Sequence, residues 1–189
     1  YAKTPMAHSA DILPKNRIVV ANSTHKDGNS IELYDLLKNE TVLFRDTLYS
    51  GHGVVWNPKE NLLYVLGYQH LKSYELIDWK TENPSLKLVN TWEIPDKSGH
   101  DLSRIDDENF LISTHNSVFL FNSKIKSFTP FDLLKDRKDI KSLNYSHKTN
   151  SLVYTIAEES WWTENIYMVN PMKTIKLPGL KLYKVRKAI

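Results

Sequence analysis

Three histidines recur at one position of an internal repeat and are the residues best suited to chemistry. His8, His52 and His100 each stand ten residues before an apolar run, "IVV", "LLY" and "FLI". Imidazole nitrogens are common ligands of divalent metals, and three that converge leave coordination positions open for a substrate. The pattern therefore predicts a site for Zn²⁺, Mn²⁺, Fe²⁺ or Ni²⁺. The alternative is a structural role, in which each histidine hydrogen-bonds a neighbouring strand.

The fourth row of this repeat lacks a histidine. Counting back ten residues from the run "LVYT" leads to Ser142, and Lys141 stands beside that gap. Because side chains alternate along a strand, residues four positions further on share the side of the column. In the third row this residue is Arg104, which we expect to be buried against an internal carboxylate or a ligand's acidic group. Lys141 and Arg104 are predicted catalytic residues, and Trp56, at the same position in the second row, is a predicted substrate contact.

The segment "AEESWWTE", residues 157–164, is the other unusual stretch. Glu158 and Glu159 are predicted to act in catalysis, as an acid, a base or a metal ligand. Trp161 and Trp162 are predicted to bind substrate, because exposed indole faces stack on sugar rings. The alternative is that both indoles only cover the end of a packed sheet.

The elements that would position these residues repeat with the period of a propeller. The column positions are 44, 48 and 42 residues apart, and a turn containing Asn, in most rows with Pro or Asp, separates each column position from its apolar run. A third alternating stretch and a looser outer strand follow each run. No segment has a helical period. The third stretches are "SIELYDL", "LKSYEL", "SVFLFN" and "NIYMVN"; the outer ones are "ETVLFRD", "LKLVNTWEI", "SFTPFDL" and "KTIKLPG".

These features predict an all-β fold, a β-propeller of four-stranded antiparallel blades, with a β-sandwich as the rival. A single domain over residues 1–189 would hold blades at approximately 8–51, 52–99, 100–138 and 139–189. Residues 1–7 are expected to end an earlier blade, so the chain is expected to lack one or more blades at its N-terminal side. Propeller geometry would then gather the histidine column at one channel mouth. A loop containing His115, a further predicted substrate contact, would lie on that face.

Composition narrows the function classes. The chain has 189 residues, 41% of them hydrophobic, no cysteine and a net charge of +3 from interspersed Lys, Arg, Asp and Glu. The sequence contains no run of eighteen apolar residues, so it predicts no membrane span. It has only six glycines and no phosphate-loop motif, which argues against a nucleotide cofactor. The basic segment "KLYKVRKAI", residues 181–189, alternates as a strand does and lacks the long basic block of a nucleic-acid binder. We expect a monomer.

The ordered set "HSADILPKNRIVVANS", "HGVVWNPKENLLYVLG", "GHDLSRI", "KSLNYS" and "AEESWWTENI" resembles an uncharacterised family of exported bacterial β-propeller proteins, over residues 8–169. The resemblance implies a secreted or periplasmic protein with an additional N-terminal segment. In architecture and histidine usage alone, the sequence is similar to oligogalacturonate lyase propellers, which hold a divalent metal and cleave acidic sugars.

Two functions of different classes follow from these observations. The first is a divalent-metal and ligand site acting on an acidic carbohydrate, which in an enzyme would be a metal-assisted polysaccharide lyase or hydrolase. The second is a non-catalytic propeller that binds a glycan or protein partner on the same face, with histidines that are structural.

Overall fold

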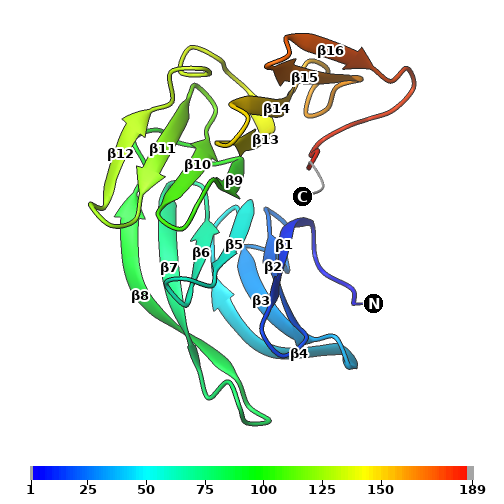
Figure 1. Cartoon of the computed structure of the whole chain (residues 1–189). Helices are drawn as coiled ribbons and strands as arrows, with labels where there is room; N and C mark the ends of the chain where they lie inside the picture. Colours follow the sequence, from blue (N-terminus) through cyan, green and yellow to red (C-terminus); the bar gives the residue numbers. More distant parts are fainter. Residues whose placement is uncertain (1, 187–189) are drawn as a thin grey trace. The chain divides into compact units, whose positions relative to one another are not determined.

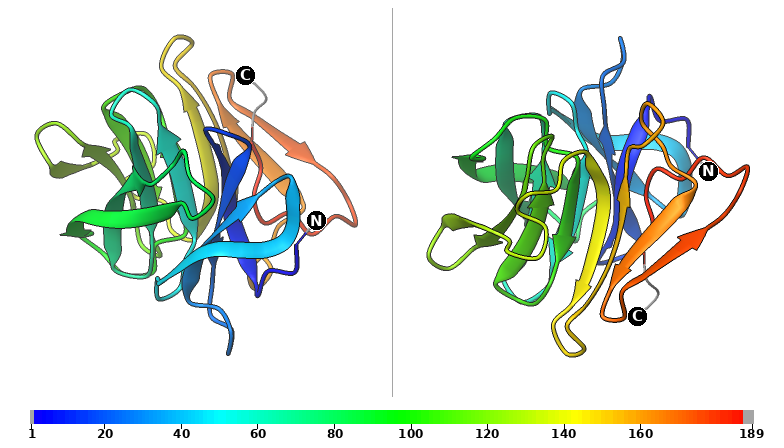
Figure 2. Two further views of the ribbon diagram at one scale, coloured as in Figure 1. Left: turned by 90° about the horizontal axis from the view of Figure 1, so that it is seen from below. Right: turned by 90° about the horizontal axis from the view of Figure 1, so that it is seen from above.

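The computed structural model describes residues 2–186, except for the side chain of Asn39. Within these residues it contains sixteen strands and no helix, and the strands form four antiparallel four-stranded sheets (Figures 1 and 2). The described part of the chain accordingly offers no helix able to cross a membrane. Each sheet is a meander of four consecutive strands, as in a propeller blade, so the predicted all-β propeller class is confirmed. The chain divides into two compact units, Tyr1–Ile94 and Pro95–Ile189.

The first unit contains two blades, and each falls within one predicted repeat to within a residue. The first blade comprises β1 (Ala7–Leu13), β2 (Arg17–Asn22), β3 (Ser30–Asp35) and β4 (Lys38–Thr47). The second comprises β5 (Gly53–Asn57), β6 (Leu62–Leu66), β7 (His70–Ile77) and β8 (Ser85–Glu93).

The second unit also contains two blades, and it carries most of the predicted site residues. Its first blade comprises β9 (Asp101–Arg104), β10 (Asn109–Ser113), β11 (Val118–Asn122) and β12 (Ser127–Pro130). Its second comprises β13 (Ile140–Ser146), β14 (Ser151–Ile156), β15 (Asn165–Val169) and β16 (Lys173–Lys176).

The apolar runs of the repeat become the second strand of each blade. Val19, Leu63, Leu111 and Leu152 occupy these strands, and all four side chains are fully buried. A strand covered on both faces needs a nearly continuous apolar sequence rather than strict alternation. The runs therefore form the centre of the hydrophobic clusters within each unit.

Asparagines shape the turn that enters the second strand. Asn16, Asn61 and Asn150 adopt positive φ angles of 56°, 57° and 48°. Asparagine tolerates this left-handed conformation better than most residues, because its short side chain can hydrogen-bond locally. The turn signals in the sequence thus mark real hairpins, which fix the register of the strands on either side.

A carboxylate links the first strands of the two blades in each unit. The Asp11 carboxylate on β1 accepts a hydrogen bond from the backbone N–H of Trp56 on β5, at 2.7 Å. In the second unit, Asp101 on β9 accepts from the N–H of Leu143 on β13, at 2.9 Å. We call each of these contacts a carboxylate clamp. Because first strands of neighbouring blades do not pair by backbone ladders, the clamps set their relative position.

The C-terminal end of the chain differs from the strand expected there. Leu182 forms an isolated bridge with Thr163, and residues 183–186 belong to no strand, so the expected alternating strand is wrong for this part. The reason is that the extended backbone of this part bonds to side chains rather than to a neighbouring strand: the Tyr183 carbonyl accepts from Thr155 Oγ1, and the Val185 N–H donates to Ser142 Oγ. Residues 187–189 of that prediction, and Tyr1 of the predicted earlier blade, lie outside the described residues.

Candidate metal centre

Three residues of the second unit bring metal-ligating atoms together at the ends of strands. His100 directly precedes β9, His115 lies in the turn between β10 and β11, and Asp139 directly precedes β13. Backbone hydrogen bonds hold these positions, because the N–H of His100 donates to the Ser113 carbonyl at 2.8 Å and that of Asp139 donates to the His115 carbonyl at 2.9 Å. Backbone hydrogen bonds alone thus hold these three short segments next to one another.

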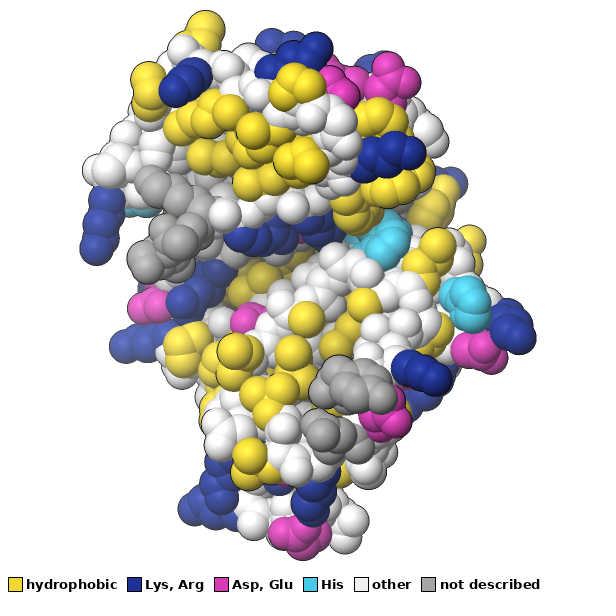
Figure 3. All heavy atoms as spheres, turned by 90° about the vertical axis from the view of Figure 1, so that its right-hand side faces the viewer, with side chains coloured by type: hydrophobic (Ala, Val, Ile, Leu, Met, Phe, Trp, Pro, Cys, Tyr) yellow, Lys and Arg dark blue, Asp and Glu magenta, His cyan; other side chains and the backbone are white. Residues whose placement is uncertain are grey.

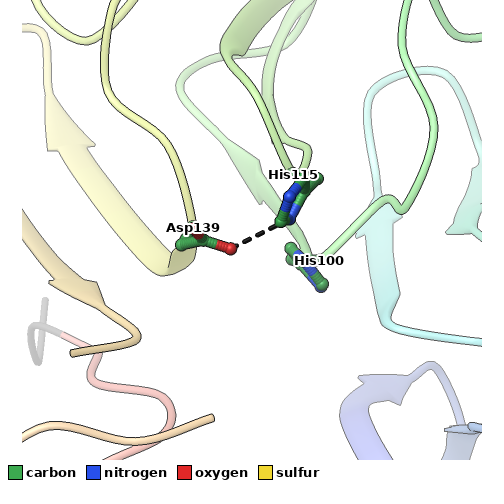
Figure 4. Close-up of side chains that lie close together, drawn as sticks. All are labelled: His100, His115 and Asp139. Carbon is green, nitrogen blue, oxygen red and sulfur yellow. Dashed lines mark ion pairs between the residues drawn. The ribbon is translucent and has the colours of Figure 1, made fainter. Parts of the chain in front are cut away.

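The side chains of this cluster converge, as Figure 4 shows. One ligand atom from each of His100, His115 and Asp139 lies within 4.8 Å of the other two. His115 Nδ1 is 2.9 Å from a carboxylate oxygen of Asp139, and these two side chains are partly open to solvent. Two imidazoles and one carboxylate form a donor set used by Zn²⁺, Mn²⁺, Fe²⁺ and Ni²⁺ sites that keep open positions. The cluster could therefore hold a metal ion.

Lys141 adds a nearly buried amine to the edge of the cluster. Its Nζ is 2.8 Å from His100 Nε2 and 3.9 Å from the Asp139 carboxylate, and its side chain is 10% exposed. Burial lowers the pKa of Lys141, and the Asp139 carboxylate only partly offsets that effect. The amine therefore gives up its proton more readily than an exposed lysine does. The predicted catalytic role of Lys141 stays a prediction.

His8 and His52, the other two predicted metal ligands, lie together in the first unit. Their rings meet edge to face with centroids 4.4 Å apart. His52 is buried, and its Nδ1 is 2.8 Å from the carbonyl oxygen of Ser50, so in the neutral ring Nδ1 donates the proton. The predicted convergence of these two histidines with His100 stays a prediction, because it joins residues of both units.

Arg104 is exposed, so the expectation of a buried arginine is wrong. It stands at the end of β9, where its guanidinium reaches the carboxylate of Asp107 in the following turn, at 3.8 Å. The anion that pairs with Arg104 is thus the surface carboxylate of Asp107, and not a buried carboxylate. The predicted catalytic role of Arg104 stays a prediction. Trp56, the predicted substrate contact of the first unit, is half-buried and packs against the core of that unit.

Glu158 organises the loop between β14 and β15. Its carboxylate accepts hydrogen bonds from Thr163 Oγ1, Tyr167 Oη and Asn165 Nδ2. Burial opposes ionisation, but these three hydrogen bonds outweigh it and keep the pKa of Glu158 below its ordinary value. The carboxylate is therefore ionised near neutral pH and engaged within its own loop. Glu159 is exposed, and its backbone pairs with that of Trp162.

The two tryptophans of this loop have different environments. Trp161 is 53% exposed and meets Tyr183 edge to face, whereas Trp162 is half-buried, with Lys181 Nζ 5.1 Å from the centre of its ring. Hydrophobic side chains gather on the surface over the blade of β13–β16 (Figure 3). In the second unit, Trp161 and Leu180 are among the exposed large hydrophobic residues. An exposed indole of this kind can stack on a flat apolar surface such as a sugar ring.

Asp139 is the member of the cluster that sequence reasoning missed. It lies in the charged run "LLKDRKDIKS", where it resembles an ordinary surface carboxylate. The available signal was its place three residues before Ser142, in the row where the histidine is missing. His115 was found, although as a predicted substrate contact rather than a ligand.

Comparison with known proteins gives a family and a fold. The family model described as "Family of unknown function (DUF6528)" matches residues 2–189. Among solved structures, the chain is similar to Kuenenia stuttgartiensis hydrazine synthase, with a TM-score of 0.62 and 12% identity over 93% of this chain and 48% of that one. The chain thus spans about half the length of that relative, and the likeness concerns the fold alone. None of the curated proteins matches the sequence.

Proposed function

Since the chain belongs to DUF6528, a family of unknown function, we propose its function from the site itself: it binds a divalent transition metal ion through His100, His115 and Asp139. The observation that carries the proposal is the convergence of one donor atom from each residue within 4.8 Å. Imidazole donors favour Zn²⁺, Mn²⁺, Fe²⁺ or Ni²⁺ over Mg²⁺ and Ca²⁺, which prefer all-oxygen sites.

The ligand that completes this site is proposed to be an acidic carbohydrate. A cation bound by three protein side chains keeps positions for a ligand carboxylate or hydroxyl. Lys141 adds a nitrogen that can attract an anion or, as a neutral amine, accept a proton in a lyase or hydrolase reaction. The exposed Trp161 ring offers a stacking surface in the same unit. The alternative is a non-catalytic protein that binds a glycan through the same Trp161 ring. An assay for new unsaturated or reducing ends in the carbohydrate distinguishes an enzyme from such a binder.

A metal titration tests the first part of the proposal. We expect one Zn²⁺ or Mn²⁺ ion to bind per chain and Mg²⁺ to bind far more weakly. An ion that takes both His115 Nδ1 and the Asp139 carboxylate must replace the direct contact between these two side chains. Isothermal titration calorimetry measures the stoichiometry and the affinity. A chain that binds no transition metal under these conditions would show that the cluster is only an ion-pair network.

A change at Trp161 tests the carbohydrate part. We expect Trp161→Ala to weaken binding of an acidic oligosaccharide by roughly tenfold, because a stacked aromatic contact contributes about 1 kcal/mol beyond its buried area. Titration with oligogalacturonate in the presence of metal measures the change. Tyr49→Ala is the matched control, since Tyr49 is 63% exposed in the first unit and should not affect binding. Equal losses in both variants, or no loss in either, would contradict a carbohydrate surface at Trp161.

A further inference from the structure

Residues 181–186 form a segment, here called the C-terminal strap, that lies against the blade of β13–β16. In Figure 1 the strap is drawn in red, after the turn that follows β16. Two backbone hydrogen bonds join Leu182 to Thr163, at 2.9 and 3.0 Å. This bridge is the strap's only β-type pairing within the described residues. The remaining contacts of the strap come from side chains.

Two buried hydroxyl groups bind the extended backbone of the strap. Thr155 Oγ1 donates to the Tyr183 carbonyl at 2.9 Å, and the N–H of Val185 donates to Ser142 Oγ at 3.0 Å. The two hydroxyls are 2.8 Å apart. Because Thr155 uses its proton on a carbonyl, Ser142 must donate to Thr155. The donor and the acceptor of each hydrogen bond in this chain are therefore defined. Both Ser142 and Thr155 are fully buried.

A buried carboxylate binds two cationic side chains of the strap. Asp101 is fully buried, and the same carboxylate oxygen accepts from Lys184 Nζ at 2.9 Å and from Arg186 Nη2 at 2.6 Å. Burial alone would raise the pKa of Asp101, but the two cations outweigh it and keep that pKa below its ordinary value. The carboxylate is thus ionised and matches a pair of cations two residues apart on an extended chain.

The contacts of the strap resemble those of a bound peptide more than those of a segment that only shields a hydrophobic core from solvent. A segment that only sealed apolar surface would need apolar contacts, whereas this one is held through its backbone and through two charges. We propose that Asp101, Ser142, Thr155 and Thr163 form a binding site for an extended basic peptide of the pattern Tyr-Lys-x-Arg. The chain's own strap occupies the site, and a segment of the same chemistry supplied by another molecule exchanges with it. The proposal does not depend on metal binding.

An exchange experiment on the folded full chain tests this site. A protease recognition sequence is inserted after Gly179, in an exposed turn, and the folded protein is then cut. We expect the cut protein to bind a fluorescent peptide with the sequence LYKVR, measured by anisotropy as the released strap exchanges. A peptide with alanine in place of Lys184 and Arg186 should bind at least about tenfold more weakly, because both charge-assisted hydrogen bonds are lost. The uncut protein should bind neither, because a tethered strap has a millimolar effective concentration.

A second variant keeps the proposal testable if the cut protein unfolds. Full-length protein with Lys184→Ala and Arg186→Ala retains a weakened strap, and it should bind the LYKVR peptide without cutting. The matched control is Lys148→Ala with Lys173→Ala, which removes two exposed lysines and should leave peptide binding undetectable. Equal binding of LYKVR and its alanine version, or no binding to either the cut protein or the weakened-strap variant, would overturn the proposal.

Discussion

His115→Ala is expected to lower the affinity for Zn²⁺ by about two orders of magnitude. Binding free energies of protein zinc sites, about 10–16 kcal/mol, are shared among the ligands, so losing one ligand costs about 3 kcal/mol. Because His115 is partly exposed and lies in a turn, its removal should leave the fold intact. Asp139→Asn should have a similar effect, since an amide oxygen is a weaker ligand than a carboxylate. Calorimetry, or competition with a chromogenic chelator, measures both changes.

His147→Ala provides the matched control for these variants. His147 is an exposed histidine in the turn between β13 and β14 of the same unit, outside the cluster. Its removal should leave Zn²⁺ affinity unchanged. If His147→Ala weakens binding as much as His115→Ala does, the metal is bound by surface imidazoles in general, and the proposed centre is wrong.

The second large effect is expected from Asp101→Asn, which should lower the free energy of unfolding by about 3 kcal/mol at pH 7. The substitution preserves volume, but it leaves Lys184 and Arg186 without the buried carboxylate that neutralises them. Removing one partner of a buried ion pair typically costs this much, because the remaining charge stays desolvated. Urea denaturation measures the change. Asp136→Asn, at an exposed position of the same unit, should change stability by no more than about 0.5 kcal/mol.

The effect of Asp101→Asn should also depend on pH in a defined direction. The pKa of Asp101 in the folded protein lies below its ordinary value, so its contribution is complete above about pH 4 and is lost as the pH falls through the lower value. The stability difference between the original protein and the variant should therefore be constant near neutral pH and shrink in acid. A difference that grows in acid would show that Asp101 is not stabilised as an anion.

The fold could be predicted from the sequence because its signals are local and repeated. Asn16, Asn61 and Asn150 mark turns, and the apolar runs after them mark buried second strands. Local signals of this kind depend only on neighbouring residues. The strap could not be predicted in the same way, because residues 181–186 alternate as a strand does. Their conformation is set by Asp101, more than 80 residues earlier in the sequence.

The candidate site could be predicted only in part. His100 stands at a repeat position and Lys141 beside one, and their contact at 2.8 Å follows from the positions of β9 and β13. Asp139 and His115 lie in connecting segments whose geometry no repeat describes, which is why one was missed and the other was given a different role. Side-chain alternation wrongly predicted that Arg104 is buried. Arg104 is the last residue of the four-residue strand β9, and it is exposed although the three residues before it are buried.

The meander of consecutive strands has a consequence for how the chain folds during synthesis. Each blade pairs only strands that follow one another, so its contacts are close in sequence and a blade can form soon after its fourth strand leaves the ribosome. The contacts between Asp101 and the strap span 83 and 85 residues. Within the second unit they must therefore form late, after both blades exist. Until residues 184 and 186 have been synthesised, Asp101 lacks these two cationic partners, so a basic segment of another molecule would compete for the carboxylate at that stage.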